Sequence, residues 1–378
     1  MKIFYWSPFT SHVATIKAVI NSAHGLKKCF NYETTIINTF GEWKKFTKDI
    51  NSKKIKIIYN KQNKNINSTN GYFNSRIAFI RIFFHSFLFL KTILLKKKPN
   101  YLIIHLITSL PLILFLIFKF DTRLILRISG LPKLNIFRKF LWKFSNNKIQ
   151  FVTVPTKETY IKIKKMKIFD SSKIYYLPDP VFIASKIKAK KNYKEKKSNK
   201  YILNIGRLTK QKNHKLLIQS FKEISLKYNN LKLIILGDGE KYTDIKKQIK
   251  LLKLKDKVKL IGHSNNVYEY IQSSLCVIVS SLWEDPGFVM IEASALKKIV
   301  INSNCPSGPK EFFNNGKTGF LFQNNNTESL IKTFDKFMQT KKKKINFLIK
   351  KSYKKSLNYS EISHAKNLKK LFEIYEKR

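Results

Sequence analysis

Short apolar runs alternate with amphipathic stretches along most of the chain, and this alternation predicts strands and helices in turn. In the first half, the predicted strands are residues 2–6, 32–38, 54–59, 101–107, 123–129 and 149–155. Helical patterns lie between most of them, beginning with residues 11–23. Strands that alternate with helices favour a parallel sheet with helices on both faces, so this half predicts an α/β domain.

The second half repeats the alternation more regularly. Its predicted strands are 201–206, 232–239, 258–262, 275–281 and 299–304, and its predicted helices are 214–228, 240–253, 267–274 and 287–298. Eight of the twelve glycines lie within residues 206–319, several of them where a strand ends before a helix. Open α/β sheets bind ligands at the carboxyl ends of their strands, so we expect binding residues in these loops.

A charged run without apolar patterning separates the two halves, SKIKAKKNYKEKKSNK at residues 185–200. Such a run indicates a solvated linker. We therefore expect two α/β domains at residues 1–183 and 201–345, joined by a linker at 184–200. Two such domains imply an active site in the cleft between them.

The stretch WEDPGFVMIEASAL at residues 283–296 places two glutamates in a chain that is poor in acids. Pro286 disfavours helical geometry in the residue before it, so Glu284 is predicted to lie in a strand-to-helix turn. Glu292 is predicted in the second turn of the following helix, which is apolar all round and therefore buried. A buried carboxylate needs a strong partner, such as a lysine, the nearby helix N-terminus or a ligand.

The two glutamates allow two interpretations. They could be the acid and the nucleophile of a glycoside hydrolase, whose carboxyl groups lie roughly 5–9.5 Å apart, but the turn makes their separation unpredictable. Alternatively, the helix N-terminus at Gly287 and Phe288 binds a diphosphate. In that arrangement Glu292 accepts hydrogen bonds from a ribose, and Glu284 faces the group on the far phosphate. The second division of roles suits the predicted positions better.

A second candidate segment, GRLTKQKN at residues 206–213, follows the first strand of the second half. Gly206 ends that strand, and Arg207 and Lys212 lie in the loop after it. An arginine fork and a lysine point charge at a strand end suit a pyrophosphate. Together with the two glutamates, these residues predict a site for a diphosphate ligand.

These segments resemble the retaining glycosyltransferases of family 4, whose GT-B fold has two Rossmann-like domains with parallel sheets facing across a cleft. The matching pieces are NIGRLTKQKN, LIILGDGE, VKLIGHSNNVYEYIQSS, SSLWEDPGFVMIEASALKKIVINSNCPSGPKEFF and NGKTGFLF, which cover about residues 200–323 in the family's order. The resemblance implies an acceptor-binding domain at 1–183 and a nucleotide-sugar-binding domain at 201–345. It also implies C-terminal helices at 346–378 that cross back to the first domain.

The resemblance further implies roles for single residues. In the family, the arginine and lysine of the first piece bind the donor diphosphate; here they match Arg207 and Lys212. The second glutamate holds the ribose, matching Glu292, and the first contacts hydroxyl groups of the donor sugar, matching Glu284. The strand in LIIHLITS looks like the one whose histidine lies beside the donor sugar, which suggests His105.

Gly206, Gly287 and Phe288 complete the expected donor-binding set. The chain departs from the family after its first strand, where SPFTSHVA stands in place of a glycine-rich loop. Backbone contacts from such glycines are therefore not carried over, although Ser11 or His12 could face a phosphate or the acceptor.

The activity that the resemblance implies is transfer of a sugar from a nucleoside-diphosphate sugar, expected to be a UDP-sugar, with retention at the anomeric carbon. The expected acceptor is a lipid-linked saccharide in the assembly of cell-surface polysaccharide such as lipopolysaccharide. We expect no cofactor and no metal, because the cations and the helix N-terminus stabilise the leaving diphosphate. A glycoside hydrolase or a phosphorylase that uses the same glutamates is the enzyme alternative.

Net charge is the strongest signal in the composition. Lys and Arg number 74 against 23 Asp and Glu, for a formal charge of +51, yet only seven of the basic residues are Arg. Nucleic-acid-binding proteins favour Arg, so compositional bias explains the charge better, and a nucleic-acid-binding protein is the competing class. We expect no nucleic-acid partner, whereas an anionic membrane surface is a further expected partner.

Two apolar segments bear on membrane contact. Residues 102–118 contain His105 and Pro111 and favour a buried strand and helix over a membrane span. The aromatic-rich stretch 77–95 fits either a core helix or a helix lying on a bilayer. Three scattered cysteines and the lack of an evident secretory signal predict a cytoplasmic protein, with peripheral association at the inner face of the cell membrane as a further expectation.

Overall fold

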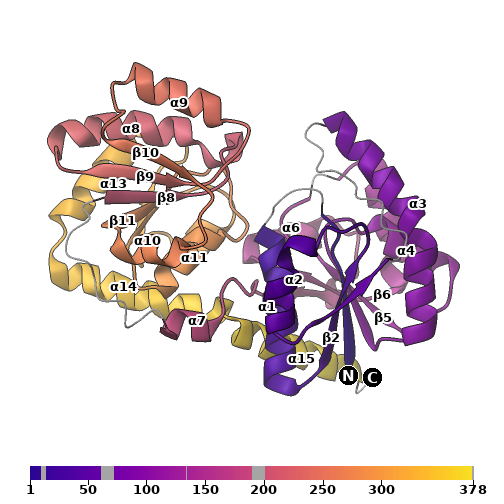
Figure 1. Cartoon of the computed structure of the whole chain (residues 1–378). Coiled ribbons are helices and arrows are strands. Elements are labelled where there is room, and N and C mark those ends of the chain that lie inside the picture. Colours follow the sequence, from indigo (N-terminus) through magenta and orange to yellow (C-terminus); the bar gives the residue numbers. More distant parts are fainter. Residues whose placement is uncertain (10–13, 61–71, 133, 190–200, 377–378) are drawn as a thin grey trace. The chain divides into compact units, whose positions relative to one another are not determined.

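The computed structural model describes residues 1–9, 14–60, 72–132, 134–189 and 201–376. The chain forms two units (Figure 1), the first comprising 1–181 with 361–378 and the second comprising 182–360. Ser11, His12 and residues 190–200 of the expected linker lie outside the described residues.

A seven-stranded parallel sheet in the order β3-β2-β1-β4-β5-β6-β7 forms the centre of the first unit. Its strands are β1 (Lys2–Trp6), β2 (Glu33–Asn38), β3 (Lys56–Tyr59), β4 (Tyr101–Ile104), β5 (Arg123–Arg127), β6 (Ile149–Val154) and β7 (Ile174–Tyr176). Consecutive side chains of β1, including Phe4, Tyr5 and Trp6, are all buried. Burial on both faces is expected for a parallel sheet between two helical layers.

Helices cover both faces of this sheet. One apolar cluster joins it to α3 (Tyr72–Lys97), α4 (Ser109–Ile117), α5 (Ile136–Phe144) and α6 (Lys157–Lys165). A second cluster on the other face joins it to α1 (Ala14–Phe30), α2 (Thr47–Ser52) and α15 (Glu361–Glu376). Helix α15 approaches α1 so closely that a Cβ on Gly25 would lie 2.4 Å from the Glu361 carbonyl oxygen, so this contact requires glycine.

A six-stranded parallel sheet in the order β10-β9-β8-β11-β12-β13 forms the centre of the second unit. Its strands are β8 (Tyr201–Ile205), β9 (Lys232–Leu236), β10 (Val258–Gly262), β11 (Cys276–Val279), β12 (Val300–Ser303) and β13 (Phe320–Phe322). Its helices are α7 (Ala184–Ala189), α8 (His214–Lys227), α9 (Tyr242–Leu251), α10 (Val267–Ser273), α11 (Phe288–Ala295), α12 (Gly308–Phe312), α13 (Thr327–Gln339) and α14 (Lys342–Ser356).

Two parallel sheets covered by helices confirm the predicted α/β class. Residues 102–118 contribute to β4 and α4, and residues 77–95 belong to α3. None of the helices in the described part of the chain is long and apolar enough to cross a membrane. Of the C-terminal helices, α14 lies in the second unit and α15 in the first.

Candidate functional site

Two loops of the second unit meet at the carboxyl ends of β8 and β11. Lys212 lies in the short 3-10 helix Lys210–Lys212 after β8, and Glu284 lies in the loop between β11 and α11. The Lys212 Nζ donates to Glu284 Oε1 at 2.5 Å. The structure thus brings together two residues that were predicted from separate segments of the sequence.

Several contacts hold Glu284 in place. Its side chain is buried, and its Oε1 also accepts a hydrogen bond from the Ser281 hydroxyl at 2.6 Å. Its backbone N–H donates to the Pro306 carbonyl at 2.8 Å, and its carbonyl accepts from the Ser307 N–H at 2.9 Å. The carboxylate is therefore positioned by its own loop and by the loop after β12.

Gly206 makes room for the Lys212 side chain. A Cβ on Gly206 would lie 3.1 Å from both Cγ and Cδ of Lys212, so the lysine stem runs directly over the glycine. The neighbouring loop after β9 is equally close, because a Cβ on Gly237 would lie 1.9 Å from the Gly206 carbonyl oxygen. Glycines at these strand ends therefore permit the close packing of the loops that position Lys212.

The N-terminus of α11 follows the Glu284 loop directly. Helix α11 begins at Phe288 and is preceded by Gly287 with φ of +98°, a left-handed conformation that favours glycine. Its N-cap residue, Gly287, has no side chain that could cap the first turn. The N–H groups of a helix start are a suitable place for an anion, as the sequence predicted for Gly287 and Phe288.

Glu292 lies in the second turn of α11, in agreement with its predicted position. Its side chain is 7% exposed, and its Oε1 accepts a long hydrogen bond of 3.4 Å from the Tyr268 hydroxyl of α10. Residues 290–295 of α11 are all buried, which confirms that the helix is enclosed. A carboxylate in such surroundings favours a polar partner.

Arg207 differs from Lys212 in its surroundings. Its side chain is exposed, and within the described part of the chain no ion pair involves its guanidinium. The structure places it directly after Gly206, at the carboxyl end of β8. Its five N–H donors are thus presented at the edge where the Lys212 and α11 donors are also found.

His105 lies in the first unit, directly after β4. Its backbone N–H donates to the Trp6 carbonyl at 2.8 Å, and its ring is 1% exposed. Neither ring nitrogen has a hydrogen-bond partner among the described residues. Burial, together with the positive charge of Arg127, holds the pKa of the imidazole well below its usual range, so His105 is neutral at neutral pH.

Two residues that contact the predicted site were missed in the sequence. Ser281 bonds to Glu284, and Tyr268 bonds to Glu292. The serine pair at 280–281, two small polar residues ending an apolar strand, was a signal for the first. Tyr268 had no local signal, because its contact with Glu292 depends on the packing of α10 against α11.

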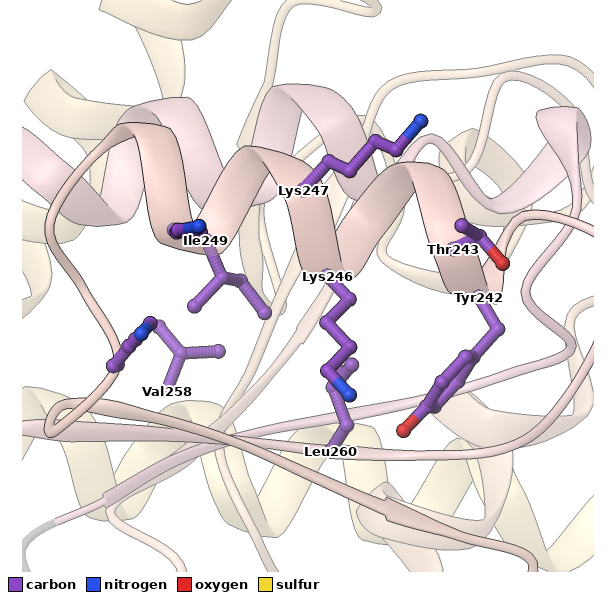
Figure 2. Close-up of a pocket in the computed structure, with 9 residues that line it drawn as sticks. Tyr242, Thr243, Lys246, Lys247, Ile249, Val258 and Leu260 are labelled. Atoms are coloured by element: carbon purple, nitrogen blue, oxygen red, sulfur yellow. The ribbon is translucent and has the colours of Figure 1, made fainter.

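A cavity of about 470 Å³ opens elsewhere in the second unit, between α9 and the edge strand β10 (Figure 2). Its apolar lining includes Ile249, Val258 and Leu260, with four lysines around them. None of the predicted site residues lines it. It is therefore separate from the strand-end loops described above.

Comparison with known structures identifies the architecture. The chain is similar to Anabaena HepE in complex with UDP and glucose, with a TM-score of 0.75, 14% sequence identity and 99% of both chains covered. Two parallel α/β units of this kind define the GT-B fold, which confirms the predicted fold.

Comparison with known sequences identifies the family. Residues 185–355 match the model of the family described as glycosyl transferases group 1. An uncharacterized glycosyltransferase of Methanocaldococcus jannaschii is 31% identical over 301 residues, covering 74% of this chain and 71% of that protein. The chain therefore belongs to the group 1 glycosyltransferases, family 4, as the sequence motifs predicted.

A further relative has a more specific name. The N-acetylgalactosamine-N,N'-diacetylbacillosaminyl-diphospho-undecaprenol 4-alpha-N-acetylgalactosaminyltransferase of Campylobacter jejuni is 33% identical over 156 residues. That match covers 41% of this chain and 40% of the relative.

Proposed function

We propose that this glycosyltransferase takes a sugar from a UDP-sugar and transfers it, with retention, to a lipid-linked saccharide in cell-surface polysaccharide assembly. The observation that carries the proposal is the Lys212–Glu284 pair, which joins the loop after β8 to the loop that leads from β11 into α11. The UDP bound to Anabaena HepE and the diphospho-undecaprenol named for the Campylobacter relative support the choice of donor and acceptor.

The diphosphate of the donor is proposed to bind between Arg207, Lys212 and the N-terminus of α11. Lys212 has three N–H donors and uses one for Glu284, so it can hold a phosphate oxygen without releasing the carboxylate. The exposed Arg207 supplies a fork of donors suited to phosphate oxygens. The first turn of α11, whose N-cap residue is Gly287, adds backbone N–H groups and the positive end of the helix dipole.

The two glutamates are proposed to recognise the two ends of the donor. The buried carboxylate of Glu292 accepts hydrogen bonds from the ribose hydroxyls. Glu284 accepts hydrogen bonds from hydroxyls of the donor sugar, and its contacts with Lys212 and Ser281 hold it in one position. Fixed acceptors of this kind orient the anomeric carbon for attack.

The cations and the helix N-terminus are proposed to replace a metal ion in this reaction. Negative charge develops on the diphosphate as the bond to the sugar breaks, and preorganised donors stabilise it. The departing phosphate accepts the proton of the incoming hydroxyl on the same face, so no covalent nucleophile is needed. His105, as a neutral imidazole, is proposed to donate one hydrogen bond to the donor sugar.

Substitution of the two glutamates tests the proposal. Glu292→Ala should weaken binding of the UDP-sugar about 10- to 100-fold and lower turnover as well, because the ribose loses its acceptor. Glu284→Ala should lower kcat about 100-fold with a smaller change in donor KM, because its contacts matter most in the transition state. Donor binding is measured by thermal shift with a panel of nucleotide sugars, and turnover by transfer to a lipid-linked saccharide.

Glu240→Ala, at an exposed position of the same unit, is the control and should leave both readings unchanged. Thermal unfolding of each variant separates loss of function from loss of fold. Near wild-type transfer by both Glu284→Ala and Glu292→Ala would disprove the assignment of the site. Transfer that stops on addition of EDTA would contradict the metal-independent reaction.

A further inference from the structure

Four large apolar side chains lie exposed along one side of α5 in the first unit. They are Ile136, Phe137, Phe140 and Phe144, here called the α5 outer face, and they are between 56% and 78% exposed. At 3.6 residues per turn, they fall within about 100° of the helix circumference. Exposed apolar side chains gathered in one stripe are typical of interaction sites.

The remainder of α5 explains why the helix is stable with this face exposed. The Asn135 side chain caps its N-terminus by accepting from the Arg138 N–H at 2.8 Å. Leu141 and Trp142 are buried in the core that joins α5 to the sheet. The outer face is therefore not needed for packing within the unit.

Exposed apolar side chains recur on the neighbouring helices of the same layer. Helix α4 contacts both α3 and α5. Phe84 and Leu88 of α3 and Leu116 and Ile117 of α4 are exposed. On the opposite face of the sheet, the described residues of α1 and α2 expose no large apolar side chain, and α15 exposes Ile374. The exposed apolar surface is thus concentrated on the side of α3, α4 and α5.

Positive charge accompanies the apolar surface. Residues 72–148 contain fourteen Lys and Arg but one acid, Asp121, which pairs with Lys98 at 2.8 Å. On α5, Lys139 and Lys143 are exposed, each three residues after a member of the outer face, and so they border it. Lysine stems can extend along an apolar surface while their charges reach phosphate groups.

We propose that the α5 outer face inserts into the headgroup region of an anionic bilayer, with Lys139 and Lys143 at the lipid phosphates. A helix with an apolar face bordered by lysines has the chemistry of an interfacial helix, and both contributions add to its affinity. Nucleic acid fits less well, because this face presents phenylalanines where phosphate contacts require cations. The inference deepens the proposed function and rests on its lipid-linked acceptor, because such an acceptor lies at the membrane surface.

Sedimentation with vesicles tests this surface on the full chain. The vesicles contain equal parts of phosphatidylcholine and phosphatidylglycerol, or phosphatidylcholine alone. We expect wild-type protein to bind the anionic vesicles more strongly and to bind less as salt is added. Phe137→Ser/Phe140→Ser should lower partitioning into anionic vesicles about 10- to 100-fold, because two aromatic side chains no longer enter the interface.

The second unit offers a matched control. Leu226 and Leu251 are exposed to a similar extent, so Leu226→Ser/Leu251→Ser removes apolar surface of the same kind away from α5. This control should bind the anionic vesicles within about twofold of wild type. Thermal unfolding of both double variants should match wild type, since neither change touches the core.

Several results would overturn the inference. Equal vesicle binding by wild type and Phe137→Ser/Phe140→Ser would show that α5 does not insert. A change in the oligomeric state of that variant without vesicles would show that a second copy of the chain covers the face. Loss of RNA binding instead of vesicle binding would assign the face to nucleic acid.

Transfer to a water-soluble saccharide acceptor separates this inference from the proposed function. The α5 variant should retain wild-type transfer to the soluble acceptor, because α5 contributes no residue to the candidate donor site. Vesicle binding that depends on α5 in a protein without transferase activity would support the surface and contradict the proposed function. Transferase activity in a protein that does not bind vesicles would support the proposed function and contradict the membrane surface.

Discussion

Lys212 and Glu284 lie largely out of water, with side chains 17% and 8% exposed, and each provides the counter-ion of the other. The gain from such a pair over a well-packed apolar pair is small, but the loss of one partner is costly, because the other charge stays buried. Stability alone is therefore a weak explanation for this buried pair. Its position at the carboxyl ends of two strands favours a role in ligand binding.

Breaking the pair from either side should destabilise the protein. We expect Lys212→Met and Glu284→Gln each to lower the free energy of unfolding by about 1–3 kcal/mol, with the double variant less destabilised than the sum. The coupling energy should be about 1–2 kcal/mol, measured by urea denaturation of the four proteins.

Lys210→Met provides the control for this cycle. Lys210 is exposed and lies in the same 3-10 helix, so its substitution should change the free energy of unfolding by less than about 0.5 kcal/mol. Strict additivity of Lys212→Met and Glu284→Gln would show that the contact contributes nothing.

Gly206 offers a different test, since its substitution should affect donor binding more than folding. The three atoms nearest to its added Cβ would all belong to the flexible Lys212 stem, the closest at 3.1 Å, so Gly206→Ala should displace the lysine while leaving the backbone in place. We expect the donor KM to rise about three- to tenfold, with stability within about 1 kcal/mol of wild type. Steady-state kinetics and urea denaturation give the two readings.

Gly237→Ala is the contrasting variant. Its Cβ would lie 1.9 Å from the Gly206 carbonyl oxygen, and its φ is +141°, so the backbone itself would have to move. This variant should lose stability as well as donor binding. An unchanged donor KM in Gly206→Ala would show that the added Cβ does not displace Lys212 from the position in which it binds the donor.

Most residues of the candidate site could be located from the sequence because their signals are local. Pro286 and Gly287 place Glu284 in a turn, and the apolar run after them places Glu292 on a buried helix. The Lys212–Glu284 contact could not be predicted from the sequence, because it depends on β8 and β11 being neighbours in the sheet. The contact of Tyr268 with Glu292 could not be predicted either, since helix packing decides which side chain reaches Glu292.

At the scale of single elements, α15 is held to the first unit by polar as well as apolar contacts. The Nδ1 of His364 lies 2.8 Å from the Pro178 carbonyl, and its Nε2 lies 3.0 Å from the Ser22 hydroxyl of α1. The ring is 1% exposed. Burial, with the positive charge of Arg127, lowers the pKa of the imidazole to about 3.

The docking of α15 should therefore weaken in acid. In the unfolded chain the pKa of His364 returns to about 6.5, above its folded value, so only the unfolded state takes up a proton between these values. The stability from the neutral ring is complete above pH 6.5 and is lost as pH falls towards 3. Between pH 7 and pH 5 this loss should be about 2 kcal/mol.

Comparison of wild type with His364→Gln by urea denaturation at pH 7 and pH 5 measures this effect. The variant should lose about 2 kcal/mol less than wild type over the same interval, whatever its stability at pH 7. His263→Gln, at an exposed position, is the control. Equal pH dependence of wild type and His364→Gln would show that His364 accepts its proton in the folded state.

Among the elements, the longer apolar strands could be predicted from the sequence, whereas the shortest strands could not. Residues 2–6 match β1, whereas the three-residue strands β7 and β13 have too few residues for any period to be read. The C-terminal helices at 346–378 were predicted from the resemblance to the family, and α15 lies in that range. Its partner helix was beyond prediction by periodicity, because Gly25 and Ser22 contact it across more than three hundred residues.

For the whole molecule, the distribution of charge is more informative than its total. A formal charge of +51 made chiefly of lysine is what compositional bias produces. Arginine is rare in this chain, yet five of the seven arginines lie within residues 72–148. That segment also carries the α5 outer face and has a single acid. Positive charge and exposed apolar side chains thus coincide in this segment, and an anionic lipid surface would contact both.

The close contact of α15 with α1 also has a consequence for biosynthesis. Apolar side chains of α15, among them Leu368 and Phe372, complete the core on one face of the first sheet. The ribosome makes them only after all of the second unit has been synthesised. While those more than a hundred residues are made, α1 and α2 cover only part of that face, and apolar surface left exposed during synthesis favours aggregation until the last helix arrives.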